Sequence, residues 1–152
     1  MPTSKSEMDL KRVPIAILMN YYQHQYDRMG KLEDQRLGIT NITITLSVLS
    51  LTFGFNSAVG FSKIIGYAVL AVMALANIFA ILYILVTKSW ISTHEMRAKG
   101  ILEKRAKALY VFDRQTYAEY RKWTPGRWKI QMYLHILLFL VSVTIGVFLF
   151  LS

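Results

Sequence analysis

The fold is decided by the stretch IIGYAVLAVMALANIFAILYILV, residues 64–86, which contains no Asp, Glu, Lys or Arg. Two further stretches lack these four residue types, one from Leu37 to Phe55 and one from Ile130 to Leu151. As helices the three would be about 35, 29 and 33 Å long, and the hydrocarbon core of a bilayer is about 30 Å thick. We therefore expect an all-α membrane protein with three transmembrane helices.

A soluble bundle of buried helices is the alternative, and the first stretch is compatible with it. Residues 39–45, Ile-Thr-Asn-Ile-Thr-Ile-Thr, are polar and β-branched enough to resemble a strand. A helix at the surface of a soluble protein, however, carries charged residues on its solvated face. Three stretches without such a face favour lipid, and the first is the weakest of the three.

The positions of Lys and Arg predict the orientation of the chain. Of the 18 Lys and Arg residues, all except Lys63 lie before the first stretch or between the second and the third. Basic residues near the ends of a span are retained on the cytoplasmic side of a membrane. We expect the N-terminus to lie inside the cell and Ser152 outside.

These spans divide the chain into four parts. Residues 1–36 form a cytoplasmic N-terminal segment, in which an amphipathic helix should begin near Pro14. Residues 37–87 form a transmembrane hairpin, residues 88–129 a basic cytoplasmic segment, and residues 130–152 the third span. Residues 88–122 contain no proline, so we expect one long cytoplasmic helix that continues the second span.

An incomplete apolar stripe, which includes Ile101 and Leu109, runs along one side of this cytoplasmic helix. It must pack on the N-terminal helix, on a neighbouring subunit or on lipid headgroups, and packing within the subunit is the favoured alternative. We predict that Ile101 and Leu109 belong to an assembly helix.

Motifs for catalysis and metal binding are missing. The chain has no cysteine, and His24, His94 and His135 lie on different segments without ligand-spaced partners. We expect no enzyme, no catalytic residue, no cofactor and no metal site. The net charge of +9 could indicate a nucleic-acid partner, but the excess flanks the apolar stretches, so it indicates membrane orientation instead.

Polar residues inside the spans are the remaining candidates for function. Asn41, Thr45 and Thr52 lie near one face of the first span, and Asn77 lies near the middle of the second. Hydrogen bonding between helices is one explanation, and the lining of a pore or a hydrated crevice is the other. The spacings Ala76-x-x-x-Ala80 and Ser142-x-x-x-Gly146 would permit close helix approach, which suggests association of subunits.

The run ILMNYYQHQYDRMGKLEDQRLGITNI, residues 17–42, followed by LSVLSLTFGF, residues 46–55, resembles the RipA family of small bacterial membrane proteins. This resemblance implies a homo-oligomer, an octamer, in the bacterial cytoplasmic (inner) membrane, with a role in stress and no established catalytic residues. The chain is more distantly similar to small transmembrane effectors of antiphage defence systems, although it ends in a span where most of those end in a cytoplasmic helix.

We therefore expect a non-enzymatic, multi-pass membrane protein whose spans form or gate a permeation path in stress response or antiphage defence. The alternative is a membrane-anchored scaffold that recruits a cytoplasmic protein partner through its basic helices.

Overall fold

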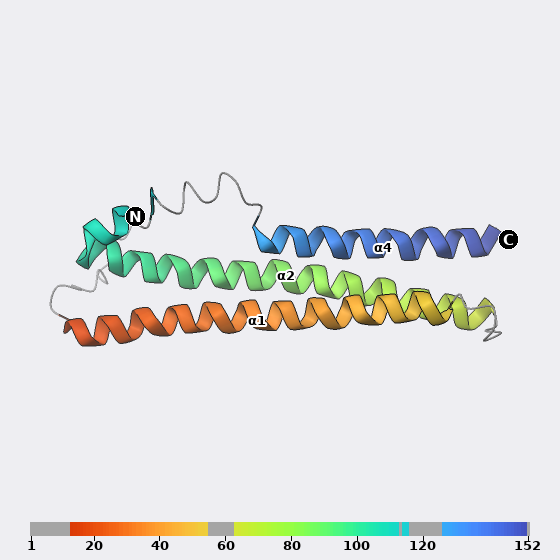
Figure 1. Ribbon diagram of the computed structural model, residues 1–152, viewed down its shortest axis with the longest axis horizontal. Helices are drawn as coiled ribbons and strands as arrows, with labels where there is room; N and C mark the ends of the chain where they lie inside the picture. The colour runs from red at the N-terminus through yellow and green to blue at the C-terminus, as the bar shows by residue number, and fades with distance from the viewer. Residues whose placement is uncertain (1–12, 55–62, 113, 116–125, 152) are drawn as a thin grey trace, which may run out of the picture. The chain divides into compact units, whose positions relative to one another are not determined.

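The computed structural model describes residues 13–54, 63–112, 114–115 and 126–151. Three long helices account for most of them: α1 (Ile15–Gly54), α2 (Lys63–Arg105) and α4 (Arg127–Leu151) (Figure 1). Residues 107–112 and 114–115 are also helical. Among the described residues the fold is all-helical, as the sequence predicts.

The ends of the helices follow from their local sequence. At the start of α1, the carbonyl of Pro14 accepts hydrogen bonds from Ile17 N at 3.1 Å and Leu18 N at 3.3 Å. Proline suits this position because the first helical turn leaves its N–H groups unpaired. At the C-terminal end of α2, Lys104 and Arg105 occupy the last turn, where positive charge complements the helix dipole.

The long cytoplasmic helix predicted for residues 88–122 is shorter than expected. The helix that continues the second apolar stretch ends at Arg105, and a new helical segment begins at residue 107. Hydrogen bonds from Ala106 N to Leu102 O and from Tyr110 N to Ala106 O join the two segments. No glycine or proline lies at the break, and nothing in the local sequence explains it. The last part of the predicted helix, residues 116–122, lies outside the described residues.

The chain divides into two compact units. Unit one comprises residues 13–32, 89–112 and 114–115, and unit two comprises residues 33–54, 63–88 and 126–151. In unit one the first half of α1 packs on the end of α2, where Leu18, Ala98 and Ile101 are buried. Gln25 Oε1 and His94 Nδ1 lie 2.6 Å apart, and Arg105 donates a hydrogen bond to the Val13 carbonyl at 3.3 Å.

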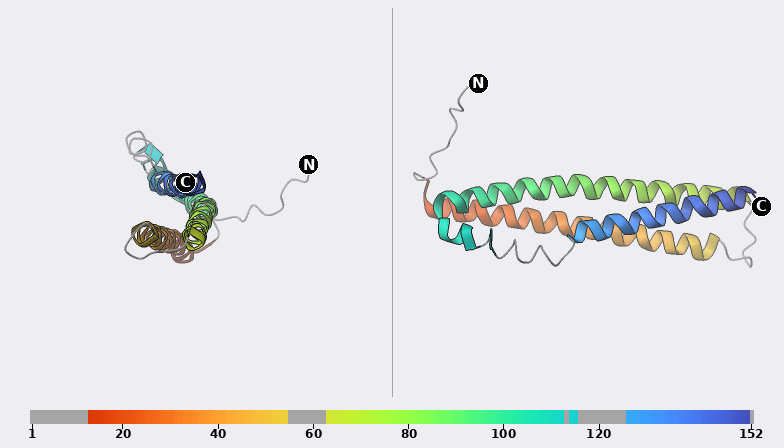
Figure 2. Two further views of the ribbon diagram at one scale, coloured as in Figure 1. Left: turned by 90° about the vertical axis from the view of Figure 1, so that its right-hand side faces the viewer. Right: turned by 90° about the horizontal axis from the view of Figure 1, so that it is seen from above.

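In unit two α2 lies alongside both α1 and α4 (Figures 1 and 2). Two helices in the described part of the chain, α2 and α4, are long and apolar enough to cross a membrane. Only 28% of the most apolar part of α2 and 11% of that of α4 are buried, whereas the core helix of a soluble protein would be mostly buried. The first predicted span is helical up to Gly54, but it is not among these apolar helices, so the count of three spans remains a prediction.

Candidate functional site

Unit two has a polar interior. On the part of α1 that belongs to this unit, the buried side chains are Arg36, Thr40, Thr43 and Ser47. Their spacing of four, three and four residues places them on one face of the helix. On α4 the described buried side chains are His135 and Ser142, which are seven residues apart. The buried apolar residues of unit two (Leu70, Met73, Ala80 and Ile84) all belong to α2.

Asn77 connects the three helices at the centre of this interior. Its Nδ2 donates hydrogen bonds to the Met73 carbonyl at 2.9 Å and to Ser47 Oγ on α1 at 3.1 Å. Its Oδ1 lies 2.9 Å from Nδ1 of His135 on α4. All three side chains are almost fully buried, with exposures of 0% for Asn77 and His135 and 1% for Ser47. One amide therefore holds α1 and α4 to α2.

The hydrogen bonds of Asn77 determine the tautomer of a neutral His135. A backbone carbonyl can only accept, so the atom of Asn77 that faces Met73 O must be the NH₂ group. The other amide atom is then the oxygen, which accepts a hydrogen bond from the Nδ1–H group of His135. In neutral His135 this leaves Nε2 with a free lone pair, a proton acceptor buried between helices.

Several buried polar atoms of α1 and α4 have no hydrogen-bond partner among the described residues: Arg36 Nε, Thr40 Oγ1, Gln131 Oε1 and His135 Nε2. Buried polar groups in proteins are nearly always satisfied by protein or by ordered water. These four atoms include donors and acceptors, and they belong to the same two helices, α1 and α4, that Asn77 contacts. We call the residues of these atoms, the buried Thr43 and the Asn77 contacts together the polar core: Arg36, Thr40, Thr43, Ser47, Asn77, Gln131 and His135.

The polar span residues that the sequence singles out lie in two different environments. Asn77 lies at the centre of the polar core, but Asn41, Thr45 and Thr52 are exposed on the surface of the single chain. The Thr52 hydroxyl donates to the Val48 carbonyl of its own helix at 2.9 Å, which satisfies it without a second helix. The structure does not bring these three residues together with Asn77.

The two residues proposed for assembly also differ. Ile101 is buried in unit one with 9% exposure, whereas Leu109 is 61% exposed. The predicted stripe therefore packs partly within the subunit, through Ile101, and leaves Leu109 uncovered.

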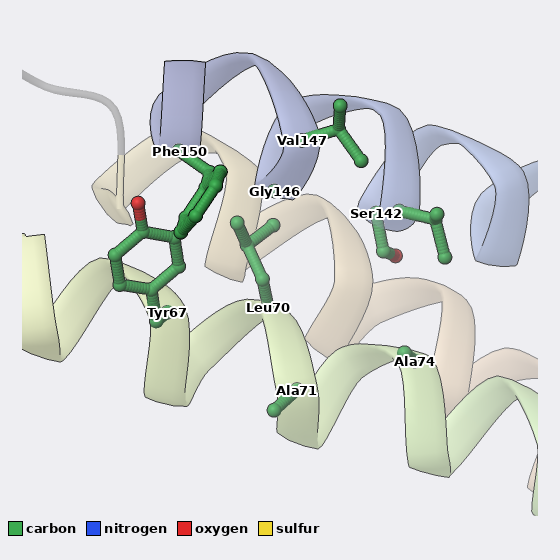
Figure 3. A pocket seen from close by; sticks show the side chains of 9 residues that line it. Tyr67, Leu70, Ala71, Ala74, Ser142, Gly146, Val147 and Phe150 are labelled. Carbon is green, nitrogen blue, oxygen red and sulfur yellow. The ribbon is translucent and has the colours of Figure 1, made fainter. Parts of the chain in front are cut away.

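An apolar groove of about 380 Å³ lies between α2 and α4, near the start of α2 and the end of α4 (Figure 3). It is lined by Tyr67, Leu70, Ala71, Ala74, Ser142, Val143, Gly146, Val147 and Phe150. A Cβ atom added at Gly146 would lie 3.9 Å from Leu70 Cδ1, an ordinary contact. The Ser142-x-x-x-Gly146 spacing therefore lines a groove, and the approach of α4 to α2 does not require glycine at position 146.

Among the described residues, no group of three or more His, Cys, Asp or Glu side chains is placed to hold a metal ion. Comparisons with protein-family models, with curated proteins and with solved structures found no match for this chain.

Proposed function

We propose that this chain is a non-enzymatic, homo-oligomeric protein of the bacterial cytoplasmic membrane, and that its polar core forms or gates a path for protons or small ions. The observation that carries this proposal is the polar interior of unit two. Ser47, Asn77 and His135 link three helices, and neighbouring buried polar atoms have no partner among the described residues. Flux into liposomes tests it.

The membrane part of the proposal rests on the distribution of side chains in unit two. Large apolar side chains face outward on both apolar helices, among them Leu75 at 66%, Phe79 at 59% and Phe148 at 72% exposure. The interior, in contrast, contains polar side chains from all three helices. A soluble protein would bury its apolar side chains, whereas lipid favours apolar groups outside and satisfied polar groups inside. We therefore propose that α1 crosses the membrane together with α2 and α4.

The polar core also supports a path over a merely structural role. A hydroxyl group can be satisfied by a carbonyl of its own helix. The Ser142 hydroxyl, for example, donates to the Leu138 carbonyl at 2.7 Å. His135 Nε2 and Gln131 Oε1 have no such partner in the described residues. Acceptors of this kind suit water or a moving proton, because an unpaired buried polar group is costly. The role in stress response or antiphage defence rests on the family resemblance alone.

A scaffold that recruits a cytoplasmic partner is the second candidate, and unit one favours it. Large apolar side chains near its C-terminal part are exposed: Met96, Leu109 and Val111. Uncovered apolar residues of this kind indicate a contact with another protein, with a second copy of the chain or with lipid.

The proposed topology predicts the outcome of reporter fusions. Alkaline phosphatase fused after Asn20 should be inactive, and the same enzyme fused after Ser152 should be active, because the basic segments hold the N-terminus inside. An active fusion after Asn20 or an inactive one after Ser152 would contradict the orientation.

Leu109→Glu should lower the oligomer mass measured by native mass spectrometry, because a charge cannot be buried in an apolar contact without a partner. The circular dichroism of the variant should match that of the parent, since Leu109 is exposed. Ile101→Glu is the contrasting variant, and it should unfold unit one because Ile101 is buried there. An unchanged oligomer mass for Leu109→Glu would show that this face does not assemble copies of the chain.

A further inference from the structure

Four cations gather at the end of unit two where α4 begins: Arg36 on α1, Lys88 on α2, and Arg127 and Lys129 on α4. Two contacts place the three helices at the same level. Tyr83 on α2 donates to Gln35 Oε1 on α1 at 3.4 Å, and Lys88 Nζ lies 4.2 Å from the centre of the Trp128 ring on α4. We call Arg36, Lys88, Arg127 and Lys129 the basic end.

Arg36 is nearly buried without adequate compensation for its charge. Its exposure is 4%, its Nε has no partner among the described residues, and its ion pair with Glu33 is long, at 3.8 Å. Burial lowers the pKa of the Arg36 guanidinium, Glu33 acts in the opposite direction, and the charge of Arg127 lowers it further. A buried arginine beside a second arginine is unfavourable unless an anion lies near both.

The other three cations also lack carboxylate partners in the described residues. The described acidic side chains of unit two are Glu33 and Asp34, both on α1, and both are exposed. Lys88 and Lys129 instead approach one Trp128 ring, the latter with its Nζ 5.8 Å from the ring centre. One aromatic face compensates only part of one such charge.

The first turn of α4 adds to this positive field. It contains no acidic side chain, and it carries the positive end of the helix dipole, although the Lys129 N–H is paired with the Gly126 carbonyl at 2.8 Å. Gly126 precedes it, and a Cβ atom there would lie 3.0 Å from Nε1 of Trp128, so a larger residue would require the ring to shift by a few tenths of an ångström. Cations at the positive end of a helix are unfavourable unless an anion binds there.

We propose that the basic end binds a phosphate group, held by Arg36, Lys88, Arg127 and Lys129 beside Trp128. The planar guanidinium fork matches phosphate oxygens, and lysine adds point charges. The phosphate can belong to an anionic phospholipid or to a soluble ligand. The lipid source rests on the proposed membrane location, since tryptophan and basic residues between helices mark the headgroup level.

Native mass spectrometry of the full-length, delipidated protein in detergent tests this proposal. The probes are phosphatidylglycerol, phosphatidylcholine and inorganic phosphate, each titrated separately. The parent should bind phosphatidylglycerol in preference to phosphatidylcholine. The triple variant Lys88→Gln, Arg127→Gln, Lys129→Gln should weaken that binding by about tenfold. These side chains are exposed, so the variant should fold. Arg36→Lys, which keeps the charge and removes the fork, should weaken it as well.

The matched control removes three exposed charges from unit one, by Lys31→Gln, Lys107→Gln and Arg114→Gln. It should bind phosphatidylglycerol as the parent does. Binding of inorganic phosphate that the basic-end triple variant loses, without preference between the lipids, would support the site with a soluble source. Equal losses in both triple variants, or no binding of phosphatidylglycerol and of phosphate by the parent, would overturn the proposal. Neither result depends on whether the protein conducts ions.

Discussion

Replacing Asn77 with leucine should destabilise the folded protein by about 2 kcal/mol, because the change removes two contacts between helices and leaves their partners buried. Ser47 Oγ and His135 Nδ1 would both lose the group that they contact at about 3 Å. Leucine has the same number and branching of side-chain heavy atoms as asparagine and leaves no cavity, so the loss of polar contacts dominates. Unfolding by sodium dodecyl sulfate, followed by circular dichroism in mixed micelles, measures the change.

Asn41→Leu is the matched control for this variant. It replaces the same residue type on a neighbouring helix, but Asn41 is exposed and makes none of the contacts of Asn77. Its free energy of unfolding should stay within about 0.5 kcal/mol of the parent. Equal effects of the two substitutions would mean that the buried contacts of Asn77 contribute no special stability.

The all-helical fold could be predicted from the sequence, because length, apolar composition and the absence of proline are local properties. Asn77 could be singled out as a polar residue in the middle of an apolar stretch. The side of the first span that faces the other helices could not be predicted. Residues 40–52 contain two interleaved rows of hydroxyl groups at helical spacing, and both satisfy the periodicity. The structure buries the row that contains Thr43 and Ser47, which continues the line from Arg36 and Thr40.

The contact of His135 with Asn77 could not be predicted from the sequence either. A metal-binding histidine has partners at ligand spacing, and His135 has none nearby in the chain. Its contact, Asn77, lies 58 residues away and on another helix. The seven-residue spacing of His135 and Ser142 was the available signal, since it marks one face of a largely apolar helix.

Replacing His135 with leucine should reduce proton flux by roughly tenfold or more, the change that a barrier higher by about 1.4 kcal/mol produces. The variant removes the buried Nε2 acceptor and leaves Asn77 Oδ1 without its contact. An apolar side chain at this depth also favours loss of water from the interior. His135→Gln keeps a polar group there without a basic nitrogen, so it should retain the fold and lose proton flux.

The most direct test of the polar core as a path is proton flux into liposomes that contain purified parent, Asn77→Leu, His135→Leu or Asn41→Leu protein. A pH-sensitive dye trapped inside reports acidification after an imposed pH gradient, with valinomycin and potassium setting the membrane potential. Equal incorporation and equal oligomer mass are checked for each sample. The proposal predicts flux for the parent and for Asn41→Leu, and strongly reduced flux for the two variants of the polar core. Flux at the parental rate in both of those variants, or no flux through the parent at either sign of the potential, would contradict it.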